Sequence, residues 1–442
     1  MQSASIELSG WGNYPVQQCA VFNPESHAAL RAVVGNSGQP SQIPRGLGRS
    51  YGDSAINRGA GVVLQTAFNR MIEFDAASGV LHCEAGVSFA DIISIFLPRG
   101  WFLPTTPGTK FVTVGGAIAA DVHGKNHHQV GSLGNFILDL QVLLADGAEV
   151  VCSPQQLPDL FWATIGGMGL TGVITAARIQ LSRVPTAYVS VDYHRTRDLD
   201  ETLRVFTAED HKHRYSVAWI DCLAEGKALG RSIVMLADDA QVRQLPAANR
   251  EAPLRLPKKL RAAVPFNFPR FAIAPWNMRL FNKLYYSIHS DAVKIVDFNS
   301  FFYPLDSIEN WNRIYGRGGF VQYQAWFPRE TSQRGLVELL QKITASQRGS
   351  FLAVLKSCGE RDQAILSYLE PGHTLALDFA QTGNDLTALF SELDRILLSH
   401  GGRLYLAKDS MTTAATFKAM YPRLPEFIQT KSKYDPTGRF NS

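Results

Sequence analysis

The sequence predicts an α+β fold with two domains. Its length of 442 residues is more than one hydrophobic core usually serves. The predicted strands adjoin both hairpins and helices, without the strict strand–helix alternation of a parallel α/β sheet. The pattern also changes near residue 185, where a new series of alternating strands begins. We therefore expect a domain boundary at that position.

Composition narrows the classes of protein to consider. The hydrophobic content of 45% and charged content of 19% are typical of a globular protein in water. An excess of 43 basic over 39 acidic residues is too small to indicate nucleic acid as a partner. Five scattered cysteines without a CxxC pair predict neither a metal site nor a disulfide framework. We expect no signal peptide and no transmembrane helix, hence a cytoplasmic protein or one lying peripherally at the inner membrane surface.

The N-terminal half alternates short strands and helices around glycine turns. Ser88 is a predicted N-cap with Asp91 at the third helical position, and Asp146-Gly147 marks a hairpin turn. Helices are predicted at 26–35, 88–97 and 159–165, and strands at 61–65, 71–75, 80–85, 138–145, 148–152 and 173–181.

The second half predicts an antiparallel sheet with helices. Strands are expected at 188–193, 215–221, 232–235, 293–299, 319–327, 351–356 and 374–380, and helices at 199–209, 331–348 and 386–400. Residues 237–259 read as a polar loop.

A basic and aromatic stretch covers residues 254–289, with seven basic residues and no acidic one. Its prolines, the last of them Pro275, are expected to break any long helix. Such a surface suits anionic lipid headgroups. A lid over the active site with its aromatic rings packed inside is an equal alternative.

The stretch 43–55, which reads IPRGLGRSYGDSA, is the strongest candidate for a ligand-binding loop. It holds three glycines and two arginines. A glycine-rich turn can present successive backbone N–H groups to an anion, and the arginines add positive charge. A diphosphate is the expected ligand, and the alternative is an ordinary surface turn.

Residues 167–172 spell GxGxxG. A dinucleotide fingerprint must follow a strand and open a helix. Here a predicted helix precedes the motif and a predicted strand follows it. We therefore expect a tight helix-to-strand turn near a cofactor instead of a Rossmann site.

A second cluster joins Gly108, the small residues 113–116, and His123, Lys125 and Asn126. Small residues let a planar ring lie against the backbone, and the three polar side chains supply donors to such a ring or to a substrate hydroxyl. The alternative is a glycine-rich packing corner with a buried histidine.

A third cluster follows a predicted strand near the C-terminus, where Tyr405, Lys408 and Asp409 occur together. A buried lysine there could act as a base. The alternative is a solvated lysine. Gln322 and Gln324 put amides on one face of another strand, where they could bind sugar hydroxyls.

Taken together, these motifs resemble the vanillyl-alcohol-oxidase family of flavoenzymes, with its PCMH-type FAD-binding domain. The stretches that carry the resemblance are GLGRSYGD (46–53), TVGG (113–116), HGKNHH (123–128), LFWATIGGMGLTG (160–172), YSVAW (215–219), VQYQ (321–324), VLK (354–356) and GGRLYLAKDSMTTAATFKAMYPR (401–423). The resemblance implies an FAD-binding domain at 1–185, a substrate-binding domain at 186–400 with an antiparallel sheet flanked by helices, and a segment at 401–442 that returns to the FAD domain.

The resemblance also implies site residues, with FAD bound non-covalently and no metal. The implied catalytic residues are Lys408 as the base, with Tyr51 and His123 as weaker candidates. The implied cofactor-binding residues are Pro44, Arg45, Gly46, Leu47, Gly48, Arg49, Ser50, Tyr51, Gly52, Asp53, Ser54, Gly108, Thr113, Val114, Gly115, Gly116, His123, Gly124, Lys125, Asn126, Ile174 and Tyr405. The implied substrate-binding residues are Lys125, Trp219, Tyr303, Gln322, Gln324 and Lys356.

The resemblance is closest to the branch that oxidises the ribose 2-hydroxyl of a polyprenyl-phosphoryl ribose. It implies a 2-keto sugar product, the first half of an epimerisation to the arabinose donor of cell-wall arabinan. A lipid-linked sugar phosphate substrate and an NAD(P)H-dependent reductase partner are implied with it. One departure is Ala376, where that branch carries a cysteine. The alternatives are a flavoenzyme of a free sugar, alditol or aldonolactone, and a non-enzymatic nucleotide-binding protein with a decayed flavin fold.

Overall fold

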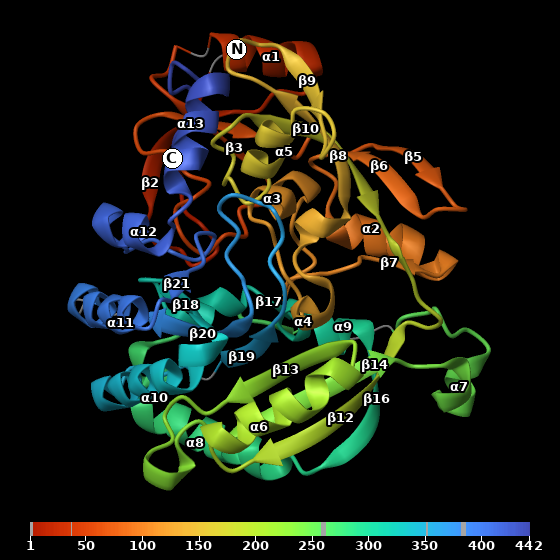
Figure 1. Ribbon diagram of the computed structural model, residues 1–442, viewed down its shortest axis with the longest axis vertical. Coiled ribbons are helices and arrows are strands. Elements are labelled where there is room, and N and C mark those ends of the chain that lie inside the picture. The colour runs from red at the N-terminus through yellow and green to blue at the C-terminus, as the bar shows by residue number, and fades with distance from the viewer. Residues whose placement is uncertain (1–2, 37, 258–261, 351, 382–385) are drawn as a thin grey trace.

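The computed structural model describes residues 3–36, 38–257, 262–350, 352–381 and 386–442. The chain forms an upper part with two sheets and a lower part built on one large sheet (Figure 1). Helices and antiparallel strands are mixed, which confirms the predicted α+β class. Within the described ranges, no helix combines the length and apolar character needed to cross a membrane.

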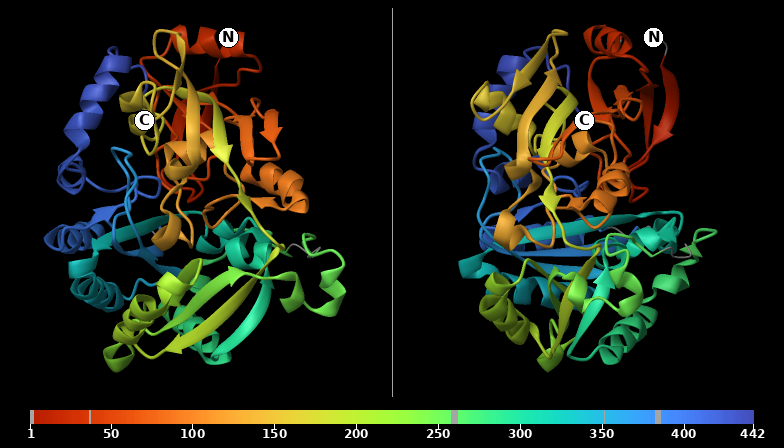
Figure 2. Two further views of the ribbon diagram at one scale, coloured as in Figure 1. Left: turned by 45° about the vertical axis from the view of Figure 1, so that its right-hand side comes forward. Right: turned by 90° about the vertical axis from the view of Figure 1, so that its right-hand side faces the viewer.

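The upper part contains two separate sheets, which the right-hand view of Figure 2 shows side by side. The first has the order β1-β2-β4-β3, with β3 and β4 parallel, so both strands point toward the same end of the sheet. Its strands are β1 (Ala4–Leu8), β2 (Gln17–Phe22), β3 (Gln42–Arg45) and β4 (Gly61–Leu64). The loop that follows β3 is the predicted anion-binding loop.

The second upper sheet is antiparallel, in the order β5-β6-β10-β8-β9. Both predicted hairpins are present in it. Its strands are β5 (Met71–Asp75), β6 (Val80–Glu84), β8 (Ile137–Leu143), β9 (Glu149–Cys152) and β10 (Val173–Gln180). The helices of this part are α1 (His27–Gly35), α2 (Phe89–Phe96), α3 (Val114–Ala119), α4 (His127–Val130) and α5 (Pro158–Thr164). At α2, Ser88 and Asp91 form the predicted capping box.

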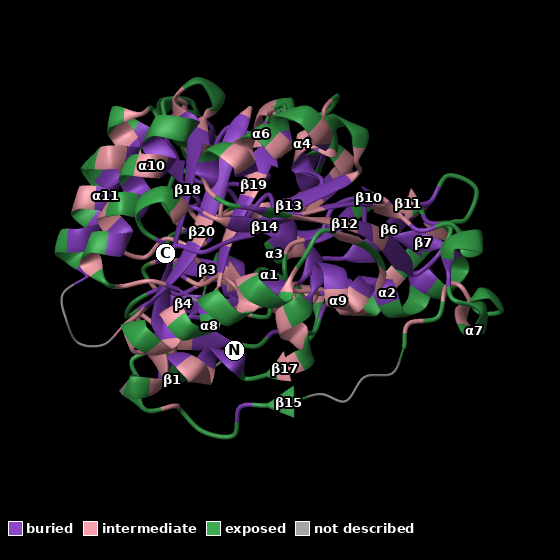
Figure 3. Ribbon diagram, turned by 90° about the horizontal axis from the view of Figure 1, so that it is seen from below, coloured by how far each residue is buried: buried purple, intermediate pink, exposed green. Residues whose placement is uncertain are grey.

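The lower part is an eight-stranded antiparallel sheet in the order β16-β12-β14-β13-β19-β20-β18-β21. Its strands are β12 (Tyr188–Thr196), β13 (Tyr215–Ile220), β14 (Ser232–Asp239), β16 (Ala292–Asp297), β18 (Phe320–Pro328), β19 (Ala353–Cys358), β20 (Gly372–Ala380) and β21 (Arg403–Leu404). Three predicted helices, α6 (Leu199–Glu209), α10 (Arg329–Ser346) and α11 (Thr387–Ser399), bury apolar side chains in one core with the sheet. Figure 3 shows their exposed outer sides over the buried strands. The sheet's remaining side faces the upper part.

One prediction about the middle of the chain was wrong. The expected loop at 237–259 begins with the end of β14 and contains a short helix, α7 (Ala247–Arg250). In the basic and aromatic stretch, the described residues form the 14-residue helix α8 (Pro275–Ile288), which begins at Pro275 and is not interrupted by it. Proline is tolerated at the first helical position, where the backbone N–H has no partner within the helix. Four residues of the predicted basic stretch, 258–261, lie outside the described residues.

The C-terminal segment contributes to both parts. Its first strand, β21, pairs with β18 at the edge of the large sheet. The chain then forms α12 (Ala414–Met420) and α13 (Leu424–Tyr434), which runs beside α5 in the upper part (Figure 1). At the end, Gln42 N donates to Arg439 O at 2.8 Å. This path carries the residues after β21 to the boundary between the two parts.

Candidate active site

A cavity of about 380 Å³ lies between the upper and lower parts, within the usual size range of ligand pockets of roughly 300–1,000 Å³. The upper part contributes the loop after β3, helix α3 and the turn before β10. The lower part contributes side chains of β13, β18, β19 and β20. Tyr405 and Lys408 of the C-terminal segment lie at the junction. The site is therefore assembled from segments far apart in the sequence.

Several backbone N–H groups of the predicted anion-binding loop have no partner among the described residues. Those of residues 46–50 donate to none of them, so five successive donors are available. Gly48 adopts a left-handed conformation with φ of +64°. The loop is anchored at one end, where Trp11 N donates to Ser50 O at 2.8 Å and Tyr51 N donates to Ala407 O at 3.1 Å. A row of free amides of this kind suits a diphosphate.

The two arginines of this loop have different roles. Arg45 donates to Ser9 O at 2.7 Å and to Ala55 O at 3.0 Å, so its guanidinium ties the loop to its neighbours. Arg49 lies over the ring of Trp11, 3.9 Å from the centroid, and burial lowers its pKa. Both side chains line the cavity. Of the two arginines, Arg49 is therefore the better placed to bind an anion.

Helix α3 packs closely behind the cavity. Thr113 caps it by accepting a hydrogen bond from Gly116 N at 3.2 Å. A Cβ atom at Gly115 would lie only 2.9 Å from the Cβ of Ala85, so glycine lets the helix approach the strand end. The GxGxxG stretch lies between α5 and β10, the predicted helix-to-strand context, and Met168, Gly169 and Gly172 line the cavity.

His123 joins the two parts across the cavity. Its Nδ1 lies 2.8 Å from Lys356 Nζ on β19, and its Nε2 lies 3.2 Å from Gln324 Nε2 on β18. Burial and the nearby Lys356 hold the pKa of His123 well below its usual value of 6.5. The imidazole is therefore neutral at pH 7, and each ring nitrogen lies within hydrogen-bond distance of a side chain of the lower part.

Lys408 lies beside Tyr51, its Nζ 3.5 Å from the ring centroid. Burial lowers the pKa of Lys408 to about 8, and Asp378 on β20 opposes that effect. Asp378 is itself buried, with its pKa raised to about 6, and it accepts hydrogen bonds from Gln322 Nε2 at 2.6 Å and Tyr315 OH at 3.1 Å. An amine with this pKa can accept a proton near neutral pH.

Two further lysines share this environment. Lys125 donates to Phe301 O and lies 4.1 Å from the Phe301 ring centroid. Burial and the charge of Lys356 lower the pKa of Lys125 to about 7, and burial lowers that of Lys356 to about 8. The charge of Lys356 also lowers the pKa of Lys408, so the cavity wall concentrates three amines that gain from a bound anion.

Five of the predicted site residues do not line the cavity. Asn126 donates to Pro104 O at 2.8 Å and accepts from Thr105 at 2.9 Å. Tyr303 OH pairs with Thr106 Oγ1 at 2.7 Å. The other three are Gly52, packed against Asp409 O; Asp53, which is exposed; and Val114, in the core. The remaining predicted residues all contribute to the lining.

Sequence reasoning missed two groups. Asp378 lies directly opposite Gln322 in the strand pairing, and a lone carboxylate in the apolar strand 374–380 was the available signal. An apolar wall was also missed apart from Trp219, because its members look like ordinary strand residues. It comprises Val217, Ala218, Met235, Tyr285, Leu352, Val354 and Ala376.

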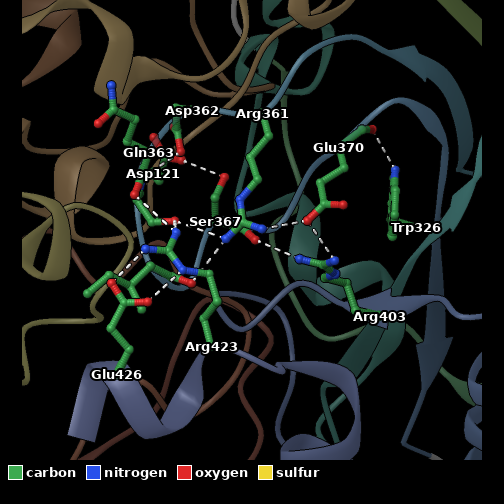
Figure 4. Close-up of polar contacts among 12 residues, drawn as sticks. Asp121, Trp326, Arg361, Asp362, Gln363, Ser367, Glu370, Arg403, Arg423 and Glu426 are labelled. Carbon is green, nitrogen blue, oxygen red and sulfur yellow. Dashed lines mark hydrogen bonds and ion pairs between the residues drawn. The ribbon is translucent and has the colours of Figure 1, made fainter. Parts of the chain in front are cut away.

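The connection between β19 and β20 clamps the two parts together (Figure 4). Asp121, next to α3, interacts with Asp362 of this connection, and burial together with that neighbour raises the pKa of Asp121 well above its usual value. Glu370 accepts from Arg361 and Arg403, each at 2.8 Å. These contacts tie the connection to the residues next to α3 and to β21.

Comparisons with known proteins agree with this arrangement. The model of an FAD-binding domain matches residues 19–153, and that of D-arabinono-1,4-lactone oxidase matches residues 325–442. A decaprenylphosphoryl-beta-D-ribose oxidase of Mycolicibacterium smegmatis is 38% identical over 98% of this chain and 95% of its own length. An uncharacterized Streptomyces coelicolor protein is 33% identical over 79% of this chain and 96% of its own. A putative D-arabinono-1,4-lactone oxidase of Neurospora crassa is 30% identical over 39% of this chain and 31% of its own.

Proposed function

This chain belongs to the FAD-binding oxidoreductase family of decaprenylphosphoryl-beta-D-ribose oxidase, and from that membership we propose that it oxidises the ribose 2-hydroxyl of a lipid-linked ribose phosphate. That it is an FAD-dependent oxidoreductase, as its motifs predicted, follows from the family. The observation that carries the proposed substrate is the cluster of Lys125, Lys356 and Lys408 on the cavity wall. It suits a substrate with both a phosphate to bind and a hydroxyl to deprotonate.

The residues present fit FAD. The free amides of 46–50 would bind its diphosphate, and α3, Ile174 and Tyr405 would hold the rest of the cofactor. When bound, FAD accepts the two electrons that leave the substrate's carbinol carbon as a hydride. We propose non-covalent attachment, because residues 44–54 contain no histidine and both ring nitrogens of His123 are engaged. The proposed domains remain 1–185, 186–400 and 401–442.

Lys408 is the proposed base. With a pKa of about 8, a useful fraction of its amine is neutral near pH 7 and takes the proton of the substrate hydroxyl at Nζ. Tyr51 keeps its own proton, because burial raises its pKa well above 10.0, so it is not available as a phenolate base. His123, held neutral, orients Lys356 and Gln324. Neither Tyr51 nor His123 is therefore the first choice as the base.

The sugar phosphate would be bound by side chains of the lower part together with Lys125 of the upper part. Lys125 and Lys356 would neutralise the phosphate, since each gains an opposite charge in a buried setting. The amides of Gln322 and Gln324 would bind sugar hydroxyls. Trp219 offers an apolar face, and Tyr303 acts through Thr106.

A free sugar, alditol or aldonolactone is the second candidate substrate class. The match of residues 325–442 to the lactone oxidase model favours it. Three buried amines and an apolar wall exceed what a small neutral sugar needs, which is why we favour the lipid-linked phosphate.

Two further proposals follow from the chemistry. A 2-keto sugar becomes an epimer only when a hydride returns to its other face, so we propose an NAD(P)H-dependent reductase as the partner. Because the lipid of such a substrate stays in the bilayer, we also propose that the protein lies peripherally at the inner membrane surface, and otherwise in the cytoplasm.

The test is flavin reduction without oxygen. Mixing the FAD-loaded protein with polyprenyl-phosphoryl ribose should bleach the flavin band at about 450 nm. Free ribose, alditols and arabinono-lactone are the comparison substrates. Bleaching by the lactone alone would replace the proposed substrate with the second candidate, and bleaching by none of them would reject both.

A further inference from the structure

Helix α8 exposes a ridge of large apolar side chains at four-residue spacing. Trp276, Leu280, Leu284 and Ile288 are 63%, 51%, 56% and 73% exposed. Residues four apart share one face of a helix, so the four side chains form one continuous line. Ridges of this kind usually mark a contact with an apolar partner.

The opposite face of α8 is fixed to the lower part. Asn282 is fully buried and donates to Asp221 Oδ1 at 2.8 Å. Met278 is 4% exposed, and Tyr286 OH donates to Thr196 O at 3.1 Å. The helix is therefore seated in its place, and the exposure of the ridge is a property of the fold.

A series of aromatic rings connects the ridge to the cavity. Trp219 and Tyr285 line the cavity, and their ring centroids lie 4.6 Å apart. Tyr285 in turn stacks on Phe281 at 6.0 Å, and Phe281, 45% exposed, follows Leu280 of the ridge. We call Trp219, Tyr285 and Phe281 the aromatic path. It leads from the apolar wall of the cavity to the outside of α8.

We propose that the aromatic path and the α8 ridge bind the apolar chain of the substrate and guide it from the cavity to the membrane surface. This inference rests on the proposed function. The lysines bind the phosphate at the polar wall, so a chain attached to that phosphate must leave along an apolar route. The path supplies one that ends at the ridge.

The charge of the chain around the α8 ridge also favours a lipid over a protein as the partner of the ridge. Residues 252–290 contain no acidic side chain, and Lys283, beside the ridge, is exposed. An apolar ridge with an exposed lysine beside it suits the boundary between anionic headgroups and acyl chains. Phe266 and Phe271, from the segment that precedes α8, add exposed rings.

The experiment compares chain lengths. The ridge variant combines Leu280→Ser, Leu284→Ser and Ile288→Ser. Its matched control combines Ile72→Ser, Leu138→Ser and Val151→Ser, three exposed apolar residues of the five-stranded upper sheet. Anaerobic flavin reduction is measured with a long-chain polyprenyl-phosphoryl ribose in anionic vesicles and with a short-chain, water-soluble analogue. Flavin absorbance and melting temperature verify that each variant is folded and loaded.

We expect the ridge variant to lose about tenfold or more in kcat/KM with the long-chain substrate and less than about twofold with the short one, because only the long chain reaches the ridge. The control variant should keep its kcat/KM with both substrates. Equal losses with both substrates, or no loss with the long one, would overturn the inference.

Two other results would also overturn it, and each is distinguishable. If the wild type is a dimer in sedimentation and the ridge variant a monomer, a second copy covers the ridge. If neither the long-chain nor the short-chain substrate reduces the flavin of the wild type, the proposed function itself has failed.

Discussion

Replacing Lys408 by methionine tests the chemical core of the proposed function. Methionine has a similar length but no amine, so it removes the base and leaves the cavity shape. A pKa that falls from 10.5 to about 8 corresponds to about 3 kcal/mol against the charged form. At pH 7 the amine is then neutral in about one molecule in ten, instead of about one in three thousand at the ordinary pKa.

In the wild type, the rate of flavin reduction should therefore rise about tenfold for each unit by which the pH increases toward about 8. Above that pH the rate should reach a plateau. The Lys408→Met variant should lose this pH dependence and about 10²–10⁴-fold of the rate, while the FAD spectrum persists. The assay is stopped-flow flavin bleaching by the substrate from pH 6 to 9.5. Lys418→Met, at an exposed position of α12, is the matched control.

A second variant separates the base from its charge. Lys408→Arg keeps a positive charge but cannot release a proton in this range, so it should be as slow as Lys408→Met. If the arginine variant keeps the wild-type rate, the amine acts through its charge alone. If the methionine variant keeps both the rate and the pH dependence, Lys408 is not the base.

Three further predictions concern the cofactor and the buried acids. Acid or heat denaturation should release FAD into the supernatant, and flavin that stays with the precipitated protein would contradict non-covalent binding. Because the Asp378 carboxylate raises the pKa of Lys408, Asp378→Asn should move the acid limb of the reduction rate to lower pH, and an unmoved limb would show that the two groups are not coupled. The raised pKa of Asp121 means that the folded protein holds a proton that the unfolded chain has released, so stability is lost as pH rises from about 4 through that raised pKa. Asp121→Asn should flatten this decline in a melting-temperature series, and equally steep curves would reject the Asp121–Asp362 pair as its source.

Local signals in the sequence predicted most of the regular elements. The capping box of Ser88 and Asp91 sets the start of α2, and α6 has the predicted bounds. Each of these depends on residues within one or two turns. Helix α8 was missed because Pro275 was taken as a breaker, whereas a proline's effect depends on whether it stands inside a helix or at its first position.

The sequence by itself determined the family and predicted the anion-binding loop, because the order of several short motifs is specific and a glycine-rich turn needs only its own residues. Only the tertiary structure decided which side chains meet. The large sheet packs against the upper part and thereby brings Gln324 and Lys356 to His123. No pattern of residues close in the sequence predicts these contacts. The lysine pKa values and the Asp378 contact depend on burial, which is a property of the assembled fold. The ridge of α8 is likewise exposed because the opposite face of that helix packs against the lower part.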